Sequence, residues 1–478
     1  MEVNYSEISR IDNSLRPYQQ NAKESIFTSW NEVDDILFQM PTGTGKTRLF
    51  TSIISDIKAW SVLKTINYKI LIIAHRIELI DQISESLDRY KISHGIIAGG
   101  RERDLRKYVQ VASIQTITHH TNIDAISDLN VGFIIIDEAH HSVASSYKKL
   151  WKLFPDAKKL GVTATPWRMN NIGFTEIYQK LITSKPIKDF ISEGWLAPYN
   201  YYSVRGNSIE QEKISSITEF DIEGDYKTSA LEREMDTVQI RARLLDSYRK
   251  IANGKKGIIY SISRKHSAHI CEEYKKAGIN IVKIDSLTPR DERKMYVQRF
   301  KNGQIDIIVN VDIFSEGFDC PDIEFIQLAR PTKSLVKYLQ QVGRGLRPTE
   351  GKSNCIILDN VGSSNEFGLP DSDRDWNLYF IGDGSEQQKA SIKTSNSPST
   401  IIGRSIKEGY DELYLVESFD STNAPRNAVS SDWSSADDEL LKLLYQDREC
   451  SPEVISMVLK REIDEINQRL DELEILPK

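Results

Sequence analysis

A short segment rich in glycine and threonine has the composition of a loop that binds phosphate. Gln39–Thr47 (QMPTGTGKT) follows an apolar run and precedes a segment with helical periodicity. Gly43 and Gly45 let the backbone turn tightly, so that its N–H groups and the dipole of the following helix point at an anion. In such a loop we expect Lys46 to contact the terminal phosphates of a nucleotide and the hydroxyl of Thr47 to bind Mg²⁺.

The alternative for this segment is a glycine-rich turn that only begins a helix. Met40 occupies the position where the strict phosphate-loop pattern has its first glycine. The order strand, loop, helix still favours phosphate binding, because it brings the loop to the N-terminus of a helix. Thr42 and Thr44 complete the loop and belong to its predicted nucleotide contacts.

A pair of adjacent carboxylates closes an apolar run further along the chain. Asp137 and Glu138 follow Phe133–Ile136 and precede Ala139 and His140. A carboxylate at a strand end beside a phosphate loop can hold Mg²⁺ through water, a role that we assign to Asp137. Glu138 can orient or deprotonate the attacking water in phosphoryl transfer. An acidic turn without catalytic function is the alternative, and the phosphate loop in the same sheet pattern argues against it.

Two series of short apolar runs, separated by segments of helical periodicity, must position these residues. Continuous runs of β-branched residues are typical of buried parallel strands, and α/β sheets bind ligands at the carboxyl ends of such strands. The predicted strands include Asp35–Met40, Ile70–Ala74, Val109–Ile114 and Phe133–Ile136 in the first series, and the strand candidates of the second are Gly257–Tyr260, Ile281–Ile284, Ile305–Val309, Phe325–Leu328 and Cys355–Leu358. The sequence therefore predicts an α/β protein with two tandem, doubly wound parallel-sheet lobes.

The chain divides into five regions on this basis. Residues 1–195 form the first lobe, which carries the phosphate loop, and residues 250–382 form the second. Residues 196–249 connect the two and contain an aromatic stretch to which the pattern assigns no role. Residues 383–431 contain a polar, serine-rich stretch and are predicted to be a linker. Residues 432–478 have helical periodicity.

The last region is predicted to be a small all-α module of three helices. Ser435 is a candidate N-cap of the first helix, and Ser451-Pro-Glu begins the second. With Trp433, these features resemble a Myb/SANT-type helix-turn-helix module. A third helix that reads DNA should be basic, whereas acidic residues outnumber basic ones between Lys460 and Glu474. Contact with DNA and docking to a protein partner therefore both stay open.

The composition is that of a soluble globular protein, with 39% hydrophobic and 27% charged residues. No apolar run is long enough to span a membrane and no signal-peptide pattern is present, so we expect a cytoplasmic protein. The four cysteines are scattered without the spacing of a zinc site. The net charge of −7 does not indicate nucleic-acid binding, although such binding requires only a local basic track.

Taken in order, these segments resemble the motifs of superfamily-2 helicases. The phosphate loop and Asp137–His140, which reads DEAH, belong to this series. The other matching segments are Leu15–Gln19 (LRPYQ), Ala74–Gln82 (motif Ia), Val111–Ile117 (the next strand-end contact), Gly161–Pro166 (motif III), Gly257–His266 (motif IV), Val309–Pro321 (motif V) and Gln340–Arg347 (motif VI). The resemblance covers about residues 10 to 380. It implies two RecA-like lobes, ATP and Mg²⁺ as cofactors, and ATP hydrolysis stimulated by DNA.

The resemblance also implies contacts with ATP outside the phosphate loop. Arg16 and Gln19 match the segment that reads the adenine base in the family. Gly317, Asp319 and Gln340 match positions of the second lobe that bind the nucleotide.

Two arginines of motif VI, Arg344 and Arg347, are predicted to complete the catalytic site. Arginine spreads the charge of a transferring phosphate, because its planar guanidinium offers fixed donors. The two arginines follow Gly343 closely, and if they are supplied across the cleft they make hydrolysis depend on closure of the lobes. Which of them acts as finger and which as sensor stays open. A basic surface patch near a helix start is the alternative.

The nucleic acid is expected to cross the outer edges of both lobes. The residues that match nucleic-acid contacts of the family are Arg76, Ser113, Thr116, Ser261 and Ser315. Hydroxyl groups and a guanidinium at strand ends suit phosphates, so binding should be independent of sequence and sensitive to salt. For each serine or threonine, an ordinary loop cap is the alternative.

The details of the motifs favour DNA as the partner over RNA. Thr163–Pro166 and Gln340–Arg347 resemble the corresponding motifs of RadD-like DNA repair helicases and of restriction-enzyme translocase subunits. The sequence therefore predicts an ATP-dependent DNA helicase or translocase that acts in DNA repair or processing. Two alternatives stay open: a duplex-DNA translocase subunit of a restriction or defence complex, and a nucleotide-gated nucleic-acid-binding protein with little turnover.

Overall fold

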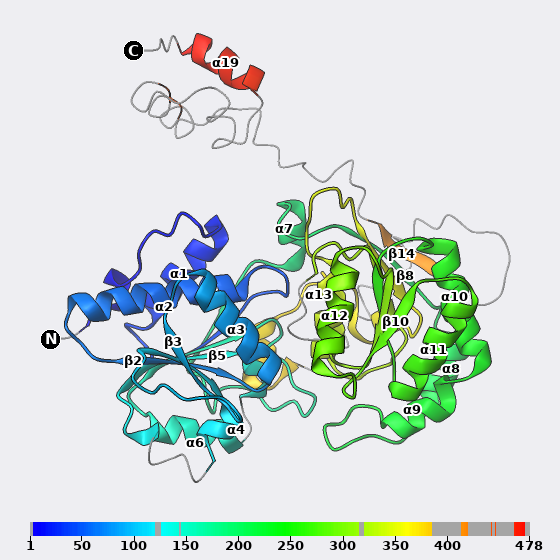
Figure 1. Cartoon of the computed structure of the whole chain (residues 1–478), viewed down its shortest axis with the longest axis horizontal. Helices are drawn as coiled ribbons and strands as arrows, with labels where there is room; N and C mark the ends of the chain where they lie inside the picture. The colour runs from blue at the N-terminus through cyan, green and yellow to red at the C-terminus, as the bar shows by residue number, and fades with distance from the viewer. Residues whose placement is uncertain are drawn as a thin grey trace. The chain divides into compact units, whose positions relative to one another are not determined.

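The computed structural model describes residues 3–119, 126–142, 145–314, 320–384, 413–418, 441, 445 and 463–473. The chain divides into two units, Met1–Ser421 and Thr422–Lys478. The first unit contains two largely parallel sheets flanked by helices, which confirms the predicted pair of α/β lobes (Figure 1). None of the described helices is both long enough and apolar enough to span a membrane.

The sheet of the first lobe has seven parallel strands in the order β3-β4-β2-β5-β6-β1-β7. These strands are β1 (Asp35–Gln39), β2 (Lys69–Ala74), β3 (His94–Ile97), β4 (Val109–Ser113), β5 (Val131–Asp137), β6 (Lys158–Thr163) and β7 (Lys180–Thr183). The strand β6 pairs with both β1 and β5. This order brings the phosphate loop after β1 and the carboxylates at the end of β5 to the same edge of the sheet.

The helices of the first lobe cover both faces of its sheet. They are η1 (Tyr5–Glu7), α1 (Pro17–Ser29), α2 (Lys46–Leu63), α3 (Ile77–Arg89), α4 (Ile114–Ile117), η2 (Ala139–His141), α6 (Ser145–Leu153) and α7 (Ile187–Ser192). Ile36 and Phe38 of β1 pack with residues of α1, α2 and α3, whereas Leu37 packs with residues of α4 and α6. Because successive side chains of a strand point to opposite faces, a continuous apolar run has to be covered on both sides. Figure 1 shows α1 and α2 on one side of this sheet and α6 on the other.

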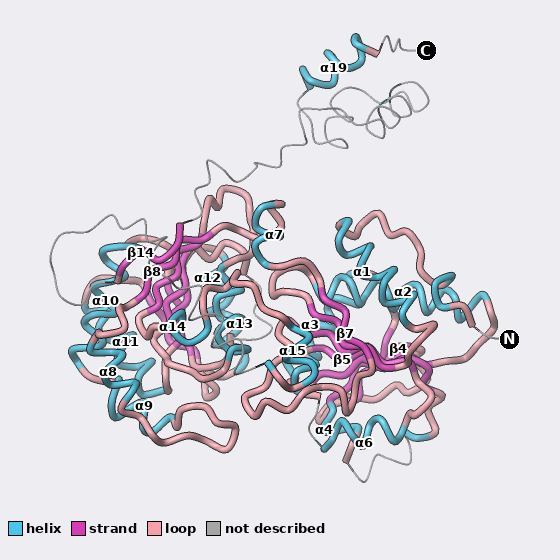
Figure 2. Tube along the Cα trace, turned by 180° about the vertical axis from the view of Figure 1, so that it is seen from behind, coloured by secondary structure: helices cyan, strands magenta, loops and turns pink. Residues whose placement is uncertain are grey.

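The second lobe repeats this layered arrangement, with the strand order β10-β11-β9-β12-β13-β8-β14. Its strands are β8 (Tyr199–Ser203), β9 (Gly257–Tyr260), β10 (Ile281–Ile284), β11 (Ile307–Asn310), β12 (Phe325–Leu328), β13 (Cys355–Asp359) and β14 (Tyr414–Ser418). Its helices are α8 (Ile209–Ser215), α9 (Thr228–Met235), α10 (Val238–Ile251), α11 (Arg264–Lys276), α12 (Arg290–Lys301), α13 (Leu335–Gly345), α14 (Ser363–Phe367) and α15 (Trp376–Ile381). Strands β8 to β13 are parallel, and β14 runs antiparallel to β8. Figure 2 shows β14 beside β8 at one edge of this sheet.

The segment 196–249, which was expected only to connect the lobes, supplies β8 and three helices of the second lobe. Its aromatic stretch forms β8, where Tyr199 and Tyr201 are buried. The hydroxyl of Tyr338 in α13 lies 3.1 Å from that of Tyr201 and joins this strand to the helix of motif VI. The strand β14 falls within the region 383–431 that was expected to be a linker, most of which lies outside the described residues.

After β13 the chain returns to the first lobe. Phe380 of α15 packs in the same core cluster as Phe174, and its carbonyl accepts a hydrogen bond of 2.7 Å from the N–H of Phe174. The guanidinium of Arg374 holds the turn before α15 by donating to four backbone carbonyls within residues 367–372. A segment that follows the second lobe in the sequence is therefore part of the core of the first.

The second unit is described at Leu441, Tyr445 and residues 463–473. Helix α19 (Ile463–Glu472) falls in the predicted third helix of the C-terminal module and buries Ile466 and Leu470. Trp433, Ser435 and most of the first two predicted helices lie outside the described residues. The three-helix arrangement stays a prediction.

Candidate nucleotide and nucleic-acid site

The phosphate loop connects the end of β1 to the start of α2, as predicted. Gly43 and Gly45 have φ angles of +89° and +91°, which a residue with a side chain rarely adopts. Gly45 is the N-cap of α2, and Lys46 and Thr47 begin its first turn. The helix therefore directs its dipole and its first N–H groups at the position where such loops hold phosphate. The hydroxyl of Thr44 donates to the carbonyl of Pro41 at 2.7 Å and so stabilises the loop itself.

The segment Leu15–Gln19, which resembles the adenine-reading motif, forms hydrogen bonds with the backbone of the phosphate loop. The hydroxyl of Tyr18 and the amide of Gln19 both donate to the carbonyl of Thr44, at 2.8 and 3.0 Å. Arg16 donates to the Tyr18 hydroxyl at 2.9 Å and lies over the ring of Trp195. In this structure the buried Gln19 is thus bonded to the loop, and Tyr18 is a loop contact that the motif comparison did not single out.

Asp137 and Glu138 are both buried at the carboxyl end of β5. Glu138 has a φ of +49°, a left-handed conformation that costs about 1–3 kcal/mol for a residue with a side chain. Nδ1 of His140 lies 3.4 Å from Oε2 of Glu138 and 3.1 Å from Oγ1 of Thr163. A histidine that was not assigned a role therefore links Glu138 to Thr163, the last residue of β6 in motif III.

Helix α13 of the second lobe packs directly against these groups. The amide of Gln340 donates to Oε2 of Glu138 at 3.3 Å. Gly343 lies so close to Thr42 that a Cβ added to it would be 2.8 Å from the Cβ of Thr42. The phosphate loop and motif VI, which lie far apart in the sequence, thus form one surface.

The electrostatic environment of Lys46 also contains groups from both lobes. Burial lowers the pKa of Lys46 below its ordinary value, and the nearby carboxylates of Glu138 and Asp137 oppose this shift. The guanidinium groups of Arg344 and Arg347 lower the pKa of Lys46 further. The two arginines predicted to complete the site therefore contribute to the electrostatic environment of Lys46.

The substitution Gly343→Ala is expected to separate α13 from the phosphate loop. Its methyl group would lie 2.8 and 3.0 Å from two carbon atoms of Thr42, so one of the two segments has to shift. Because a misplacement of about 1 Å can cost about a hundredfold in rate, we expect kcat for ATP hydrolysis to fall about ten- to hundredfold. Steady-state release of phosphate measures this loss.

The matched control is Gly206→Ala, whose added methyl meets no other atom within 4 Å. This variant should keep the wild-type rate. Titration with a fluorescent ATP analogue should show that Gly343→Ala still binds nucleotide, because Lys46 and its helix are unchanged. A Gly343→Ala protein with wild-type turnover would show that this close contact is not required for hydrolysis.

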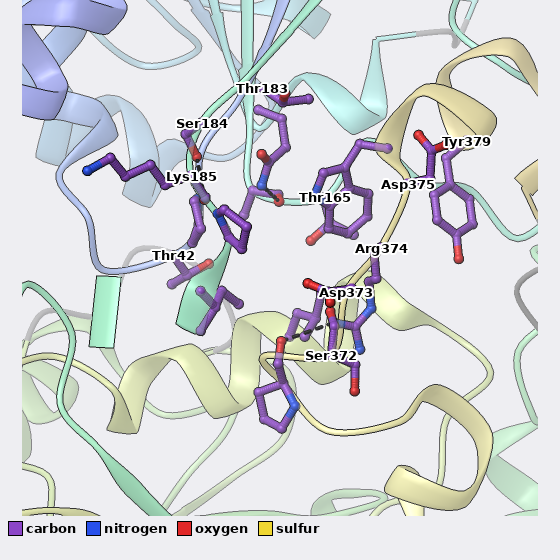
Figure 3. Close-up of a pocket in the computed structure, with 18 of the residues that line it drawn as sticks. Thr42, Thr165, Thr183, Ser184, Lys185, Ser372, Asp373, Arg374, Asp375 and Tyr379 are labelled. Atoms are coloured by element: carbon purple, nitrogen blue, oxygen red, sulfur yellow. Dashed lines mark hydrogen bonds between the residues drawn. The ribbon is translucent and has the colours of Figure 1, made fainter. Parts of the chain in front are cut away.

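A cavity of about 1030 Å³ opens beside the phosphate loop. Figure 3 shows its lining residues Thr42, Thr165, Thr183, Ser184 and Lys185 from the first lobe, together with Ser372, Asp373, Arg374, Asp375 and Tyr379 from the returning segment. Lys46, Asp137 and Glu138 do not line this cavity. It therefore adjoins the candidate catalytic groups without enclosing them.

Three of the predicted nucleic-acid contacts lie at strand or helix ends of the first lobe. Arg76 is the N-cap of α3, after β2, and its Nη1 lies 3.5 Å from the carbonyl oxygen of Asp312 in the second lobe. Ser113 ends the neighbouring strand β4, and its hydroxyl donates to Gln115 at 2.6 Å. Thr116 follows in α4. Because β2 and β4 pair in parallel, these residues share one edge of the sheet.

Ser261 differs from this expectation. It is only 1% exposed, and its hydroxyl bonds to Ser267 at 2.6 Å and to the carbonyl of Asn310 at 2.9 Å. In this conformation the hydroxyl stabilises the loop after β9, and its contact with nucleic acid stays a prediction. Ser315, Gly317 and Asp319 lie outside the described residues.

Models of two protein families match the chain. The model for the res subunit of type III restriction enzymes matches residues 12–168, and that for the helicase conserved C-terminal domain matches residues 238–349. The two matches fall on the first and the second lobe respectively.

Individual proteins match over most of the chain. A 51.5 kDa protein of a Lactococcus phage (isolate 7-9) is 35% identical over 364 residues, which are 76% of this chain and 74% of the phage protein. A Saccharomyces cerevisiae protein assigned as the ATP-dependent helicase IRC3 is 31% identical over 73% of this chain. The match covers 52% of IRC3, so the chain spans about half of that relative. The DNA 3'-5' translocase XPB2 of Sulfurisphaera tokodaii is 24% identical, over 73% of this chain and 82% of XPB2.

A solved structure has the same fold. A fragment assigned as the HsdR subunit of a type I restriction enzyme from Vibrio vulnificus YJ016 superposes with a TM-score of 0.58 and 22% identity. The superposition covers 79% of this chain and 68% of the fragment. The matches of both family models and these relatives establish the family: the chain belongs to the superfamily-2 helicases and is related to restriction-enzyme translocases. It is an ATP-hydrolysing enzyme of that family.

Proposed function

We propose that the chain couples ATP hydrolysis to movement along DNA. The observation that carries this proposal is the contact of α13 with the phosphate loop and with Glu138, to which Gln340 donates although the two residues are 202 positions apart. Since the groups required for hydrolysis come from both lobes, the site is complete only while the lobes are together. Binding and hydrolysis of ATP then close and open the lobes, and a strand held by both is displaced.

The proposed hydrolysis assigns a role to each group around the loop. Lys46 and the arginines of motif VI neutralise the charge on the γ-phosphate as it is transferred. Glu138 accepts a proton from the water whose oxygen attacks the γ-phosphorus, and the bridging oxygen leaves with ADP. His140 and Gln340, which both contact Glu138, hold this carboxylate in place.

The donors beside the loop suit Mg²⁺ as the accompanying ion. Asp137 offers a carboxylate and Thr47 a hydroxyl, which are oxygen ligands of the kind that Mg²⁺ uses together with water and phosphate. We therefore assign the two residues to an ion that enters with ATP, where it would neutralise phosphate charge.

We propose that the DNA strand crosses the junction of the two lobes at α3. Three contacts between the lobes lie there: Arg76 with Asp312 at 3.5 Å, Glu78 with Arg293 at 3.2 Å, and Asp81 with Arg290 at 2.8 Å. These contacts support a path on which a strand bound by both lobes touches Arg76, Ser113 and Thr116. The DNA assignment is supported by the relative XPB2, whose name describes a DNA translocase.

Measurement of ATP hydrolysis with single-stranded DNA, duplex DNA, forked DNA and RNA tests this proposal. DNA is expected to stimulate turnover more than RNA does, and the stimulation should fall steeply with salt because phosphate contacts release counterions. Turnover that no nucleic acid changes would contradict the motor function. Stronger stimulation by RNA would contradict the choice of DNA.

A duplex translocase that serves a restriction or defence complex is the second candidate. The family model of the first lobe favours it, since that model describes the res subunit of type III restriction enzymes. A helicase should displace the strand of a forked duplex, whereas a translocase should displace a triplex-forming strand and leave the duplex paired. The C-terminal module would then dock a protein partner, which co-purification with and without residues 422–478 measures.

A further inference from the structure

Three histidine rings lie in contact between the proposed DNA edge and the catalytic carboxylate. His75 follows β2, and His140 and His141 follow β5 in the short helix η2. The ring centroids of His75 and His141 are 4.1 Å apart, and those of His141 and His140 are 4.2 Å apart. The planes are tilted by 48° and 44°. Such distances correspond to direct contact of aromatic rings.

The sheet explains why these rings meet. Strands β2 and β5 are parallel neighbours, with Ile73 paired to Ile136. The residues that follow them therefore emerge side by side at the same edge. His75 and His141 come together across two adjacent strand ends, and no spacing in the sequence would indicate that.

One end of this row of rings is tied to the proposed DNA contacts. His75 directly precedes Arg76, the N-cap of α3. The carbonyl of His75 accepts a hydrogen bond of 3.1 Å from the amide of Gln115. The carbonyl oxygen of that same amide accepts a 2.6 Å hydrogen bond from the hydroxyl of Ser113. A phosphate that binds Arg76 or Ser113 would therefore shift the backbone at His75.

The other end of the row reaches the groups that hydrolyse ATP. Nδ1 of His140 lies 3.4 Å from the carboxylate of Glu138 and 3.1 Å from the hydroxyl of Thr163. Glu138 is held in a left-handed backbone conformation, so small movements of η2 change where its carboxylate points. The contacts from Ser113 and Arg76 to Glu138 are unbroken.

From this geometry we infer that His75 and His141 are positioning residues that transmit occupation of the DNA edge to Glu138. The inference rests on the proposed function, because it requires that DNA stimulates hydrolysis. Without DNA, Glu138 is held by Gln340 and by His140, so basal hydrolysis does not require His75 or His141. With DNA bound, the row of rings moves η2 and sets the carboxylate for the attacking water. Coupling of this kind passes through packed side chains that have two arrangements.

The test compares ATP turnover of the full chain with and without saturating single-stranded and duplex DNA oligonucleotides. In His141→Ala the row is broken, and we expect the fold stimulation by DNA to fall about three- to tenfold, the effect of one aromatic contact on a rate. In His141→Phe the ring remains, and the stimulation should stay within about twofold of wild type. His75→Ala should lose as much of the DNA stimulation as His141→Ala does. The double variant should lose no more than either single variant, since all three interrupt the same path.

Three further measurements separate coupling from damage. Basal turnover and the thermal midpoint should be unchanged in His141→Ala, and its Kd for the same oligonucleotide should match that of wild type. If DNA stimulated ATP turnover equally in wild type and in His141→Ala, the proposed coupling would be overturned and the proposed function would stand. If His141→Phe lost as much of the DNA stimulation as His141→Ala does, the coupling would also be overturned, because the contact between rings would then not be the property that matters. A wild type that no oligonucleotide stimulates would overturn the proposed function and the coupling with it.

Discussion

ATP turnover is expected to fall about 10²–10⁴-fold when Glu138 is replaced by glutamine, the usual contribution of a positioned general base. The amide has the shape of the carboxylate and can still accept the hydrogen bond from Gln340, but it cannot take a proton from water. Because Glu138 is buried, bulk water is a poor substitute for its carboxylate as the proton acceptor. Phosphate release at saturating ATP and DNA measures the effect.

Nucleotide binding should survive this substitution, because Lys46 and the phosphate loop are untouched. The matched control is Glu176→Gln, an exposed carboxylate of the same lobe that pairs with Lys148. It should keep full turnover. Undiminished hydrolysis in Glu138→Gln would remove Glu138 from the reaction and leave the DEAH segment without its proposed base.

Loss of Arg347 is expected to lower kcat about 10³–10⁵-fold, the range for an arginine that stabilises a transferring phosphoryl group. Arg347 lowers the pKa of Lys46, and its Cγ would lie 3.3 Å from a Cβ added to Gly43, so its stem contacts the phosphate loop. Arg347→Lys should retain little of the wild-type kcat, because an ammonium lacks the planar fork of donors. The affinity for an ATP analogue should change far less than kcat, since the first lobe alone carries Lys46.

The control for this prediction is Arg233→Ala, an exposed arginine of the second lobe that pairs with Glu219. Arg344→Ala tests how the two motif VI arginines divide the work. A larger loss of kcat in Arg344→Ala than in Arg347→Ala would make Arg344 the finger. If neither variant lowered kcat by more than about tenfold, the second lobe would not complete the site in the way proposed.

The local chemistry of this protein was predictable because it depends on short segments. The phosphate loop needs only two glycines, a lysine and a threonine between a strand and a helix, and QMPTGTGKT contains all of them. The buried strands were visible as β-branched runs, since a parallel sheet covered on both faces leaves no polar side to its central strands. Ile281–Ile284 and Phe325–Leu328 were placed with the bounds that the structure has.

Segments that mix polar and aromatic residues, and positions whose burial depends on distant neighbours, were harder to predict. The strand β8 is rich in tyrosine, and its pairing with β13 depends on contacts with residues more than 100 positions away. Ser261 matched a contact motif in type and position, yet the packing of β9 against β11 turns its hydroxyl into the core. Burial of a single hydroxyl depends on neighbours that a local pattern does not contain.

The sequence by itself determined which chemical groups this protein carries and on which elements they stand. Only the tertiary structure decided which groups meet: Gln340 with Glu138, Gly343 with Thr42, and His75 with His141. The physical reason is that strand order and the packing of one lobe on the other set these distances. Periodicity and composition describe a strand or a helix, whereas the pairing of elements far apart in the chain depends on the whole core.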